Sequence, residues 1–147
     1  MTYFASVLIA ASVIALAGCS RRPGATEAAR TQHKEKTMIT LQQMEDMFAN
    51  MRTKTKWDID GDMLWGYFFT DRDPKKLERA AEPLVRGGYR LVSIYQTDDK
   101  STYFLHVERI EKHTPQTLQS RNLELYRLAE EFALDSYDGM DVGPVAK

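Results

Sequence analysis

The last quarter of the chain constrains the fold more than any other stretch. It predicts a helix that begins at Pro115, behind the capping residue Thr114, and then a turn at Tyr137-Asp138-Gly139 that leads into a short apolar run from Met140 to Val145. The helix carries one apolar stripe, and such a stripe needs a sheet to pack on. The stripe consists of Leu118, Leu125, Ala129 and Phe132.

Three apolar, aromatic-rich segments upstream can supply that sheet, and the final run can close it as a fourth strand. They are Met63 to Thr70, Tyr89 to Gln96, and Ser101 to Glu111. The short polar link between the last two predicts a hairpin. Between the first two, a helix is expected to start at Pro74, capped by Asp71 or Asp73, and Pro83 should kink its last turn. Its buried stripe is predicted to be Leu77, Ala81, Leu84 and Val85.

The two faces of the third strand differ in character. One face is more aliphatic and should meet the helices, whereas the other lies either on the open face of the sheet or under the N-terminal helix. The first face carries Tyr103, Leu105 and Val107, and the second carries Phe104, His106 and Glu108.

A further helix is predicted over residues 41–52, where apolar residues recur at spacings of three and four. Its methionine-rich stripe is explained either by packing on its own domain or by an adaptable partner-binding surface. The stripe contains Leu41, Met44, Met47, Phe48 and Met51.

The predicted order is therefore a helix followed by βαββαβ. With right-handed crossovers, this order gives an α+β, ferredoxin-like antiparallel sandwich with two helices on one face of the sheet and an extra N-terminal helix. We assign it to one domain over residues 38–147.

The N-terminus holds the single cysteine of the chain. An apolar run ends in Leu16-Ala17-Gly18-Cys19, which resembles a bacterial lipobox. We therefore predict a lipoprotein signal peptide over residues 1–18, lipidation at Cys19, and a flexible tether over residues 19–37. Ser20 favours a membrane-anchored protein on the periplasmic side of the outer membrane. The alternative is a cytoplasmic protein whose translation starts at Met38.

The charge is unevenly distributed along the chain. Residues 20–37 carry five basic and two acidic residues, whereas residues 38–147 carry 15 basic and 19 acidic residues, a net charge of −4. An acidic domain is a poor general ligand for nucleic acid, because phosphate neutralisation needs clustered Lys and Arg. We expect a protein partner, bound through an acidic surface, and no nucleic acid. Nothing in the sequence indicates an oligomeric state.

The acidic cluster Asp58-Ile59-Asp60-Gly61-Asp62 raises the question of a calcium site. An EF-hand loop starting at Asp58 needs glycine at position 63 and a carboxylate at position 69, where this chain has Met63 and Phe69. We therefore predict a solvated turn, and neither a metal nor another cofactor.

Four segments together resemble a known family. They are Trp65-Gly66-Tyr67-Phe68-Phe69-Thr70-Asp71, Leu105-His106-Val107-Glu108, Leu128-Ala129-Glu130-Glu131-Phe132 and Tyr137-Asp138-Gly139-Met140-Asp141-Val142-Gly143. This combination is similar to the regulator of ribonuclease E activity B (RraB) family over residues 57–145. The resemblance implies a ferredoxin-like fold and a protein that acts without chemistry, by binding the endoribonuclease and lowering RNA turnover. It places the family's acidic surface at Glu108, Glu130, Glu131, Asp138 and Asp141.

Two functional hypotheses follow from the resemblance. The first is a lipid-anchored adaptor that binds an envelope protein, offering carboxylates to basic side chains and Tyr137 as an apolar anchor. The second is a cytoplasmic inhibitor of ribonuclease E that starts at Met38. Equally, Glu130 and Glu131 fit the solvated face of a helix, and Asp138-Gly139 fits a simple turn.

Two other classes of function were weighed. A nucleic-acid module would stack bases on an exposed sheet that bears Trp65, Tyr67, Phe104 and His106. An enzyme would use His106, Glu108 and Asp138 as an acid/base group, but no phosphate loop, nucleophile elbow or metal-spaced His/Cys cluster accompanies them, so we predict no enzyme. His113 precedes a helix cap and is expected to join no site.

Overall fold

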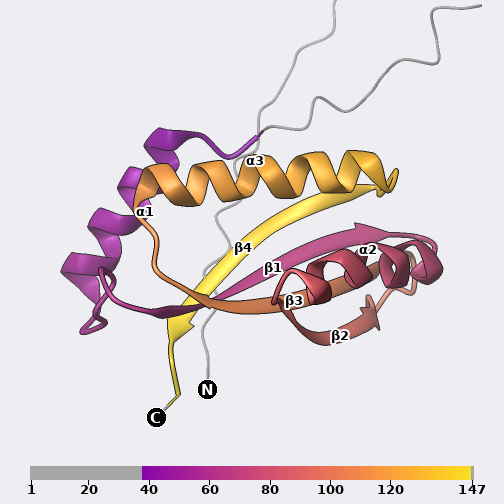
Figure 1. Cartoon of the computed structure of the whole chain (residues 1–147), viewed down its shortest axis with the longest axis horizontal. Coiled ribbons are helices and arrows are strands. Elements are labelled where there is room, and N and C mark those ends of the chain that lie inside the picture. Colours follow the sequence, from indigo (N-terminus) through magenta and orange to yellow (C-terminus); the bar gives the residue numbers. More distant parts are fainter. Residues whose placement is uncertain (1–37, 147) are drawn as a thin grey trace, which may run out of the picture. The chain divides into compact units, whose positions relative to one another are not determined.

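The computed structural model describes residues 38–146. Thr37–Lys147 forms one compact unit. The hydrophobic core of this unit is built from residues between Met44 and Tyr137. The predicted signal peptide, Cys19 and the tether lie outside the described residues. None of the described helices is long and apolar enough to cross a bilayer. Figure 1 shows the elements, which are α1 (Leu41–Lys54), β1 (Met63–Asp71), α2 (Pro74–Arg86), β2 (Arg90–Gln96), β3 (Tyr103–Glu111), α3 (Pro115–Glu131) and β4 (Ser136–Pro144).

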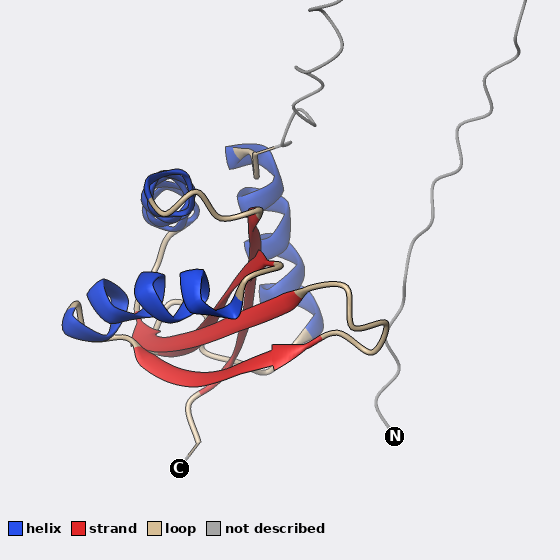
Figure 2. Ribbon diagram, turned by 90° about the vertical axis from the view of Figure 1, so that its right-hand side faces the viewer, coloured by secondary structure: helices blue, strands red, loops and turns tan. Residues whose placement is uncertain are grey.

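The four strands form one antiparallel sheet in the order β2-β3-β1-β4. Helices α2 and α3 each connect two strands and pack against the sheet (Figure 2). This topology confirms the predicted ferredoxin-like fold with an extra N-terminal helix.

Capping residues begin all three described helices, and those of α2 and α3 were predicted. Thr40 and Thr114 form capping boxes at α1 and α3, in which each threonine hydroxyl accepts from the backbone N–H three residues later. Asp73 caps α2 ahead of Pro74. One prediction for α2 is wrong: Val85 is 47% exposed, and Ala80 is buried together with the other three predicted residues.

Alternate residues of β1 form the centre of the core. Trp65, Tyr67 and Phe69 are fully buried on the helical side of the sheet. Phe48 of α1 stacks on Trp65 with a centroid distance of 6.1 Å, so α1 shares this core. Because Met44 and Met51 are also buried, packing explains the methionine stripe, and α1 does not cover the open face of the sheet.

The last strand begins earlier than predicted. Tyr137-Asp138-Gly139 lies inside β4 and not in a turn before it, because the pairing with β1 shifts register there and forms a bulge. Gly139 adopts a φ of 112°, which a glycine accepts without strain. The chain reverses at Ala133, which has a φ of 50°.

The predicted turn after α1 is confirmed. The N–H of Gly61 donates to the carbonyl oxygen of Asp58 at 3.0 Å. The Asp60 carboxylate accepts from Arg52 at 2.6 Å, so it is committed to an ion pair with α1.

Candidate protein-binding site

The end of α3 and the start of β4 present three exposed carboxylates, those of Glu130, Glu131 and Asp138. Among the described residues, none of the three has an ion pair or a side-chain hydrogen bond. We call these three residues the acidic end. Its carboxylates are therefore available to cations that approach from outside.

Two of these carboxylates stand where the helix itself disfavours negative charge. Glu130 and Glu131 occupy the last turn of α3, which contains no basic residue. By contrast, α1 ends with Arg52 and Lys54, and α2 ends with Arg86. Because the C-terminus of a helix carries partial negative charge, each misplaced carboxylate costs about 0.3–1 kcal/mol.

A buried carboxylate holds the scaffold beneath the acidic end. Asp71, 2% exposed at the end of β1, accepts from the backbone N–H groups of Asp73 at 2.8 Å and Asp135 at 3.1 Å. Lys76 of α2 donates to the same side chain at 3.3 Å and to the carbonyl oxygen of Ala133 at 2.9 Å. These bonds fix the loop between α3 and β4, and with it the spacing of the exposed acids.

Tyr137 is not part of this exposed surface. Its side chain is 2% exposed, packs edge-on against Tyr126, and donates its hydroxyl to Asn122 of α3. The proposed role as an apolar anchor for a partner is therefore wrong, because the residue belongs to the core. The alternation along β4 sends Tyr137 inward while the neighbouring Asp138 stays exposed.

The other two predicted carboxylates lie on the opposite side of the sheet. Glu108 of β3 pairs with Arg90 of β2, and its second oxygen lies 3.5 Å from Nε2 of His106. Asp141 of β4 and His106 both reach over Gly66, where a Cβ would clash with them. The predicted acidic surface is thus two separate groups, one at the acidic end and one on the open face.

The acid/base group that an enzyme would need does not assemble. His106 and Glu108 are neighbours, but the third carboxylate beside them is that of Asp141, and Asp138 sits at the bulge of β4. The His106 ring stacks on Phe68 at 4.4 Å.

The predicted base-stacking surface is also incomplete. Trp65 and Tyr67 are fully buried beneath the helices, so only Phe104 and His106 of the proposed set lie on the open face. Phe104 stacks there on Tyr95 at 5.5 Å. The nucleic-acid alternative therefore lacks two of its four stacking residues.

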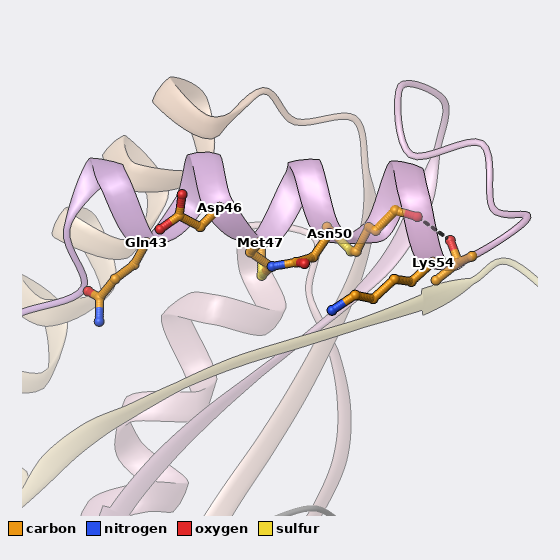
Figure 3. A pocket seen from close by; sticks show the side chains of 7 residues that line it. Gln43, Asp46, Met47, Asn50 and Lys54 are labelled. Carbon is orange, nitrogen blue, oxygen red and sulfur yellow. Dashed lines mark hydrogen bonds between the residues drawn. The ribbon is translucent and has the colours of Figure 1, made fainter. Parts of the chain in front are cut away.

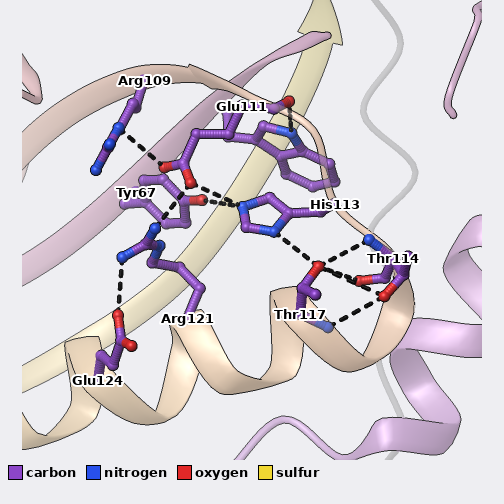
Figure 4. Close-up of polar contacts among 9 residues, drawn as sticks. Tyr67, Arg109, Glu111, His113, Thr114, Thr117, Arg121 and Glu124 are labelled. Atoms are coloured by element: carbon purple, nitrogen blue, oxygen red, sulfur yellow. Dashed lines mark hydrogen bonds and ion pairs between the residues drawn. The ribbon is translucent and has the colours of Figure 1, made fainter. Parts of the chain in front are cut away.

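A buried polar cluster joins β3, α3 and β1, and the sequence did not reveal it (Figure 4). His113, 6% exposed, lies 3.2 Å from Glu111 and 3.4 Å from the hydroxyl of Tyr67. Arg121 of α3 donates to the same Glu111 oxygen at 2.8 Å. His113 therefore has a structural role in this cluster. The signal was available in the i, i+4 spacing of His113 and Thr117, whose side chains lie 3.1 Å apart.

This cluster sets the ionisation of its members. Burial alone raises the pKa of Glu111, but the hydrogen bonds from His113 and Arg121 outweigh burial and hold its pKa below the ordinary value. Burial also raises the pKa of the Tyr67 hydroxyl. The cluster therefore joins the end of β3 to α3 through largely buried charged groups.

The outer side of α1 carries a shallow, largely apolar hollow (Figure 3). Met47 and Met51 line it, and polar side chains of the same helix surround them. The polar lining residues are Gln43, Asp46, Asn50, Lys54 and Thr55.

Comparison with known families assigns the domain. A model of the family described as regulator of ribonuclease activity B matches residues 41–142. The chain belongs to the RraB family. The match runs from the first residue of α1 into β4, so it contains the acidic end and the open-face carboxylates. The family is described as one of regulators of ribonuclease activity. No curated protein matches the chain.

Proposed function

We propose that this chain is a non-enzymatic regulator of ribonuclease activity that works by binding its protein partner at the acidic end. Glu130, Glu131 and Asp138 would accept from Arg or Lys side chains of the partner. Family membership supports the regulatory role, and the unpaired carboxylates support the surface.

The position of Glu130 and Glu131 is the observation that carries this proposal. Glu130 and Glu131 lower the stability of their own helix, and no partner within the described domain compensates for this. Such residues are expected at functional sites, where selection acts on binding and not on stability. A basic partner would relieve the repulsion between these carboxylates and the end of α3. The electrostatic free energy that destabilises the free protein would then favour binding.

The test is a double charge reversal, Glu130→Lys with Glu131→Lys. Purified ribonuclease E is titrated with each protein, and affinity and RNA cleavage rate are measured. We expect the dissociation constant to rise by about tenfold or more, because attraction becomes repulsion. The melting temperature should rise at the same time, because lysine suits a helix C-terminus.

A charge-matched control uses Glu45→Lys with Asp62→Lys, two exposed acids away from the acidic end. This control should retain affinity and inhibition. Equal loss in both pairs would indicate a nonspecific charge effect, and unchanged affinity in the first pair would refute the acidic end as the binding surface.

The same surface would serve a second candidate function, binding an envelope protein from a lipid-anchored position. The lipobox that ends at Cys19 favours this candidate. The ribonuclease regulator proposed first would be a cytoplasmic protein whose translation starts at Met38. Such a protein would retain the whole matched region. The two candidates share the acidic end and differ in compartment.

A further inference from the structure

The free edge of β2 and the neighbouring side of α2 form the most apolar surface of the described domain. Eight large hydrophobic residues are exposed in that part of the chain, and four of them belong to this one edge. They are Val85, Leu91, Val92 and Tyr95, each between 43% and 47% exposed. Such a concentration of apolar side chains points to an interaction surface.

A groove runs between the helix and the strand along this edge. Its floor is formed by Ala81 and Val85 of α2 with Leu91 and Ile94 of β2. Charged side chains of α2 form its rim, namely Glu78, Glu82 and Arg86. The strand beside it is the last of the sheet, so its outer backbone groups are free to pair with another strand.

The charges of this edge are arranged so that the edge complements itself. On α2, Glu78 lies two turns before Arg86. Glu78 has no ion pair among the described residues, and Arg86 makes one exposed pair, with Glu82 at 3.8 Å. On β2, Arg90 begins the strand and keeps an exposed side chain although it pairs with Glu108, and the acidic turn with Asp98 and Asp99 follows the end of the strand. A second copy, turned by a two-fold rotation, would run antiparallel and bring each acid toward a base.

From these observations we infer that a second copy of this chain docks here, with β2 pairing antiparallel to its counterpart. The two sheets then continue as one, and the two α2 helices lie side by side across the axis. Leu91 and Val85 of each copy lose contact with water, and Glu78 of each copy meets Arg86 of the other. The bulge at Val92 disturbs the ladder with β3, but the run from Ser93 to Gln96 remains regular for pairing.

The other edge of the sheet does not offer the same surface. Strand β4 carries the exposed acids Asp138 and Asp141, and Pro144 ends it without a backbone N–H. Like charges would meet if two copies paired there. Dimerisation at β2 leaves the acidic end unoccupied, so this inference is independent of the proposed function.

The test measures molecular mass by sedimentation equilibrium on residues 38–147, which contain the complete core. We expect a mass that rises with concentration to that of a dimer. Leu91→Lys places two lysines at the interface and should raise the dimer dissociation constant by about tenfold or more. The control is Ile110→Lys on β3, where the native side chain is 54% exposed, and this variant should still dimerise.

A charge swap tests the arrangement itself. All swap variants carry Glu82→Gln, which removes the partner of Arg86 within its own copy. In that background Glu78→Arg and Arg86→Glu should each weaken the dimer, and the double variant should restore it, because the swapped pair is again complementary across the two-fold axis. Circular dichroism verifies that each variant is folded.

A native domain that stays monomeric up to about 1 mM would overturn the inference. Equal weakening by Leu91→Lys and Ile110→Lys, or a double swap that does not recover, would overturn it too. Ribonuclease binding by the monomeric Leu91→Lys variant separates the two ideas, since that binding depends on the acidic end.

Discussion

At the scale of single residues, Glu111 links the protein's stability to pH. Its pKa is lower in the folded protein than the ordinary value of 4.5, because His113 and Arg121 donate to it. Its stabilising contribution is therefore fully present above that value and is lost as the pH falls through the lower, folded-state pKa. Acid should therefore weaken the contact between Glu111 of β3 and Arg121 of α3.

We predict that Glu111→Gln lowers the free energy of unfolding by about 1–3 kcal/mol near neutral pH, since Arg121 loses its buried acceptor. The difference from the native protein should shrink below about pH 4. Urea unfolding of the native protein and of Glu111→Gln, near neutral pH and below about pH 4, measures this difference in the free energy of unfolding. Glu124→Gln, which removes only the exposed partner of Arg121, should change little. A Glu111 effect that stays constant with pH would contradict this account.

The sequence predicted the exposure of charged residues better than it predicted the orientation of aromatic residues. Exposure of Glu130, Glu131 and Asp138 follows from polarity alone, whereas the burial of Tyr137 depends on the register of β4 against β1. Aromatic residues fit an exposed stacking surface and a core equally well, so the sequence alone left the face of Trp65 and Tyr67 open. Only the pairing of strands decides between the two.

At the scale of elements, most boundaries follow from local chemistry. The caps Asp73 and Thr114, each followed by a proline, begin α2 and α3 where expected, and Thr40 caps α1. The bulge in β4 has no comparable signal, because Asp-Gly is typical of both turns and bulges. Its position depends on long-range pairing with β1, which no local pattern encodes.

The bulge makes Gly139 hard to replace. We predict that Gly139→Ala destabilises the protein by about 1 kcal/mol or more, because an alanine is strained at a φ of 112°. Gly143→Ala in the same strand meets no atom within 4 Å and should change stability by less than about 0.5 kcal/mol. Thermal unfolding of both variants compares them. Similar losses at both positions would argue against the conformational explanation.

At the scale of the whole molecule, the order of elements was enough to predict the topology. One helix followed by βαββαβ with right-handed crossovers leaves few alternatives, and the observed strand order is the expected one. The placement of α1 was open in the sequence, and the stacking of Phe48 on Trp65 resolves it. The interaction between α1 and α3 therefore comes from packing that the sequence pattern alone does not specify.

The compartment of the whole chain is tested by labelling cells with radioactive palmitate. From the lipobox we predict that the native chain is labelled and sediments with membranes, because Cys19 accepts the lipid, and that Cys19→Ala is neither labelled nor membrane-bound. This result would favour the envelope partner and exclude the regulation of a cytoplasmic ribonuclease. Detection of a soluble, unlabelled native product beginning at Met38 would establish the cytoplasmic alternative.

The bulge at Gly139 also has a consequence for how the chain completes its folding. Strand β4 is the last to be synthesised and must find β1, far back in the sequence. If it slid by one position, Tyr137 would face water and a side chain other than hydrogen would be forced into the left-handed conformation. A misaligned intermediate therefore loses the burial of Tyr137 and also strains the backbone. One alignment of β4 is thus strongly favoured, and few misaligned intermediates are expected to slow folding.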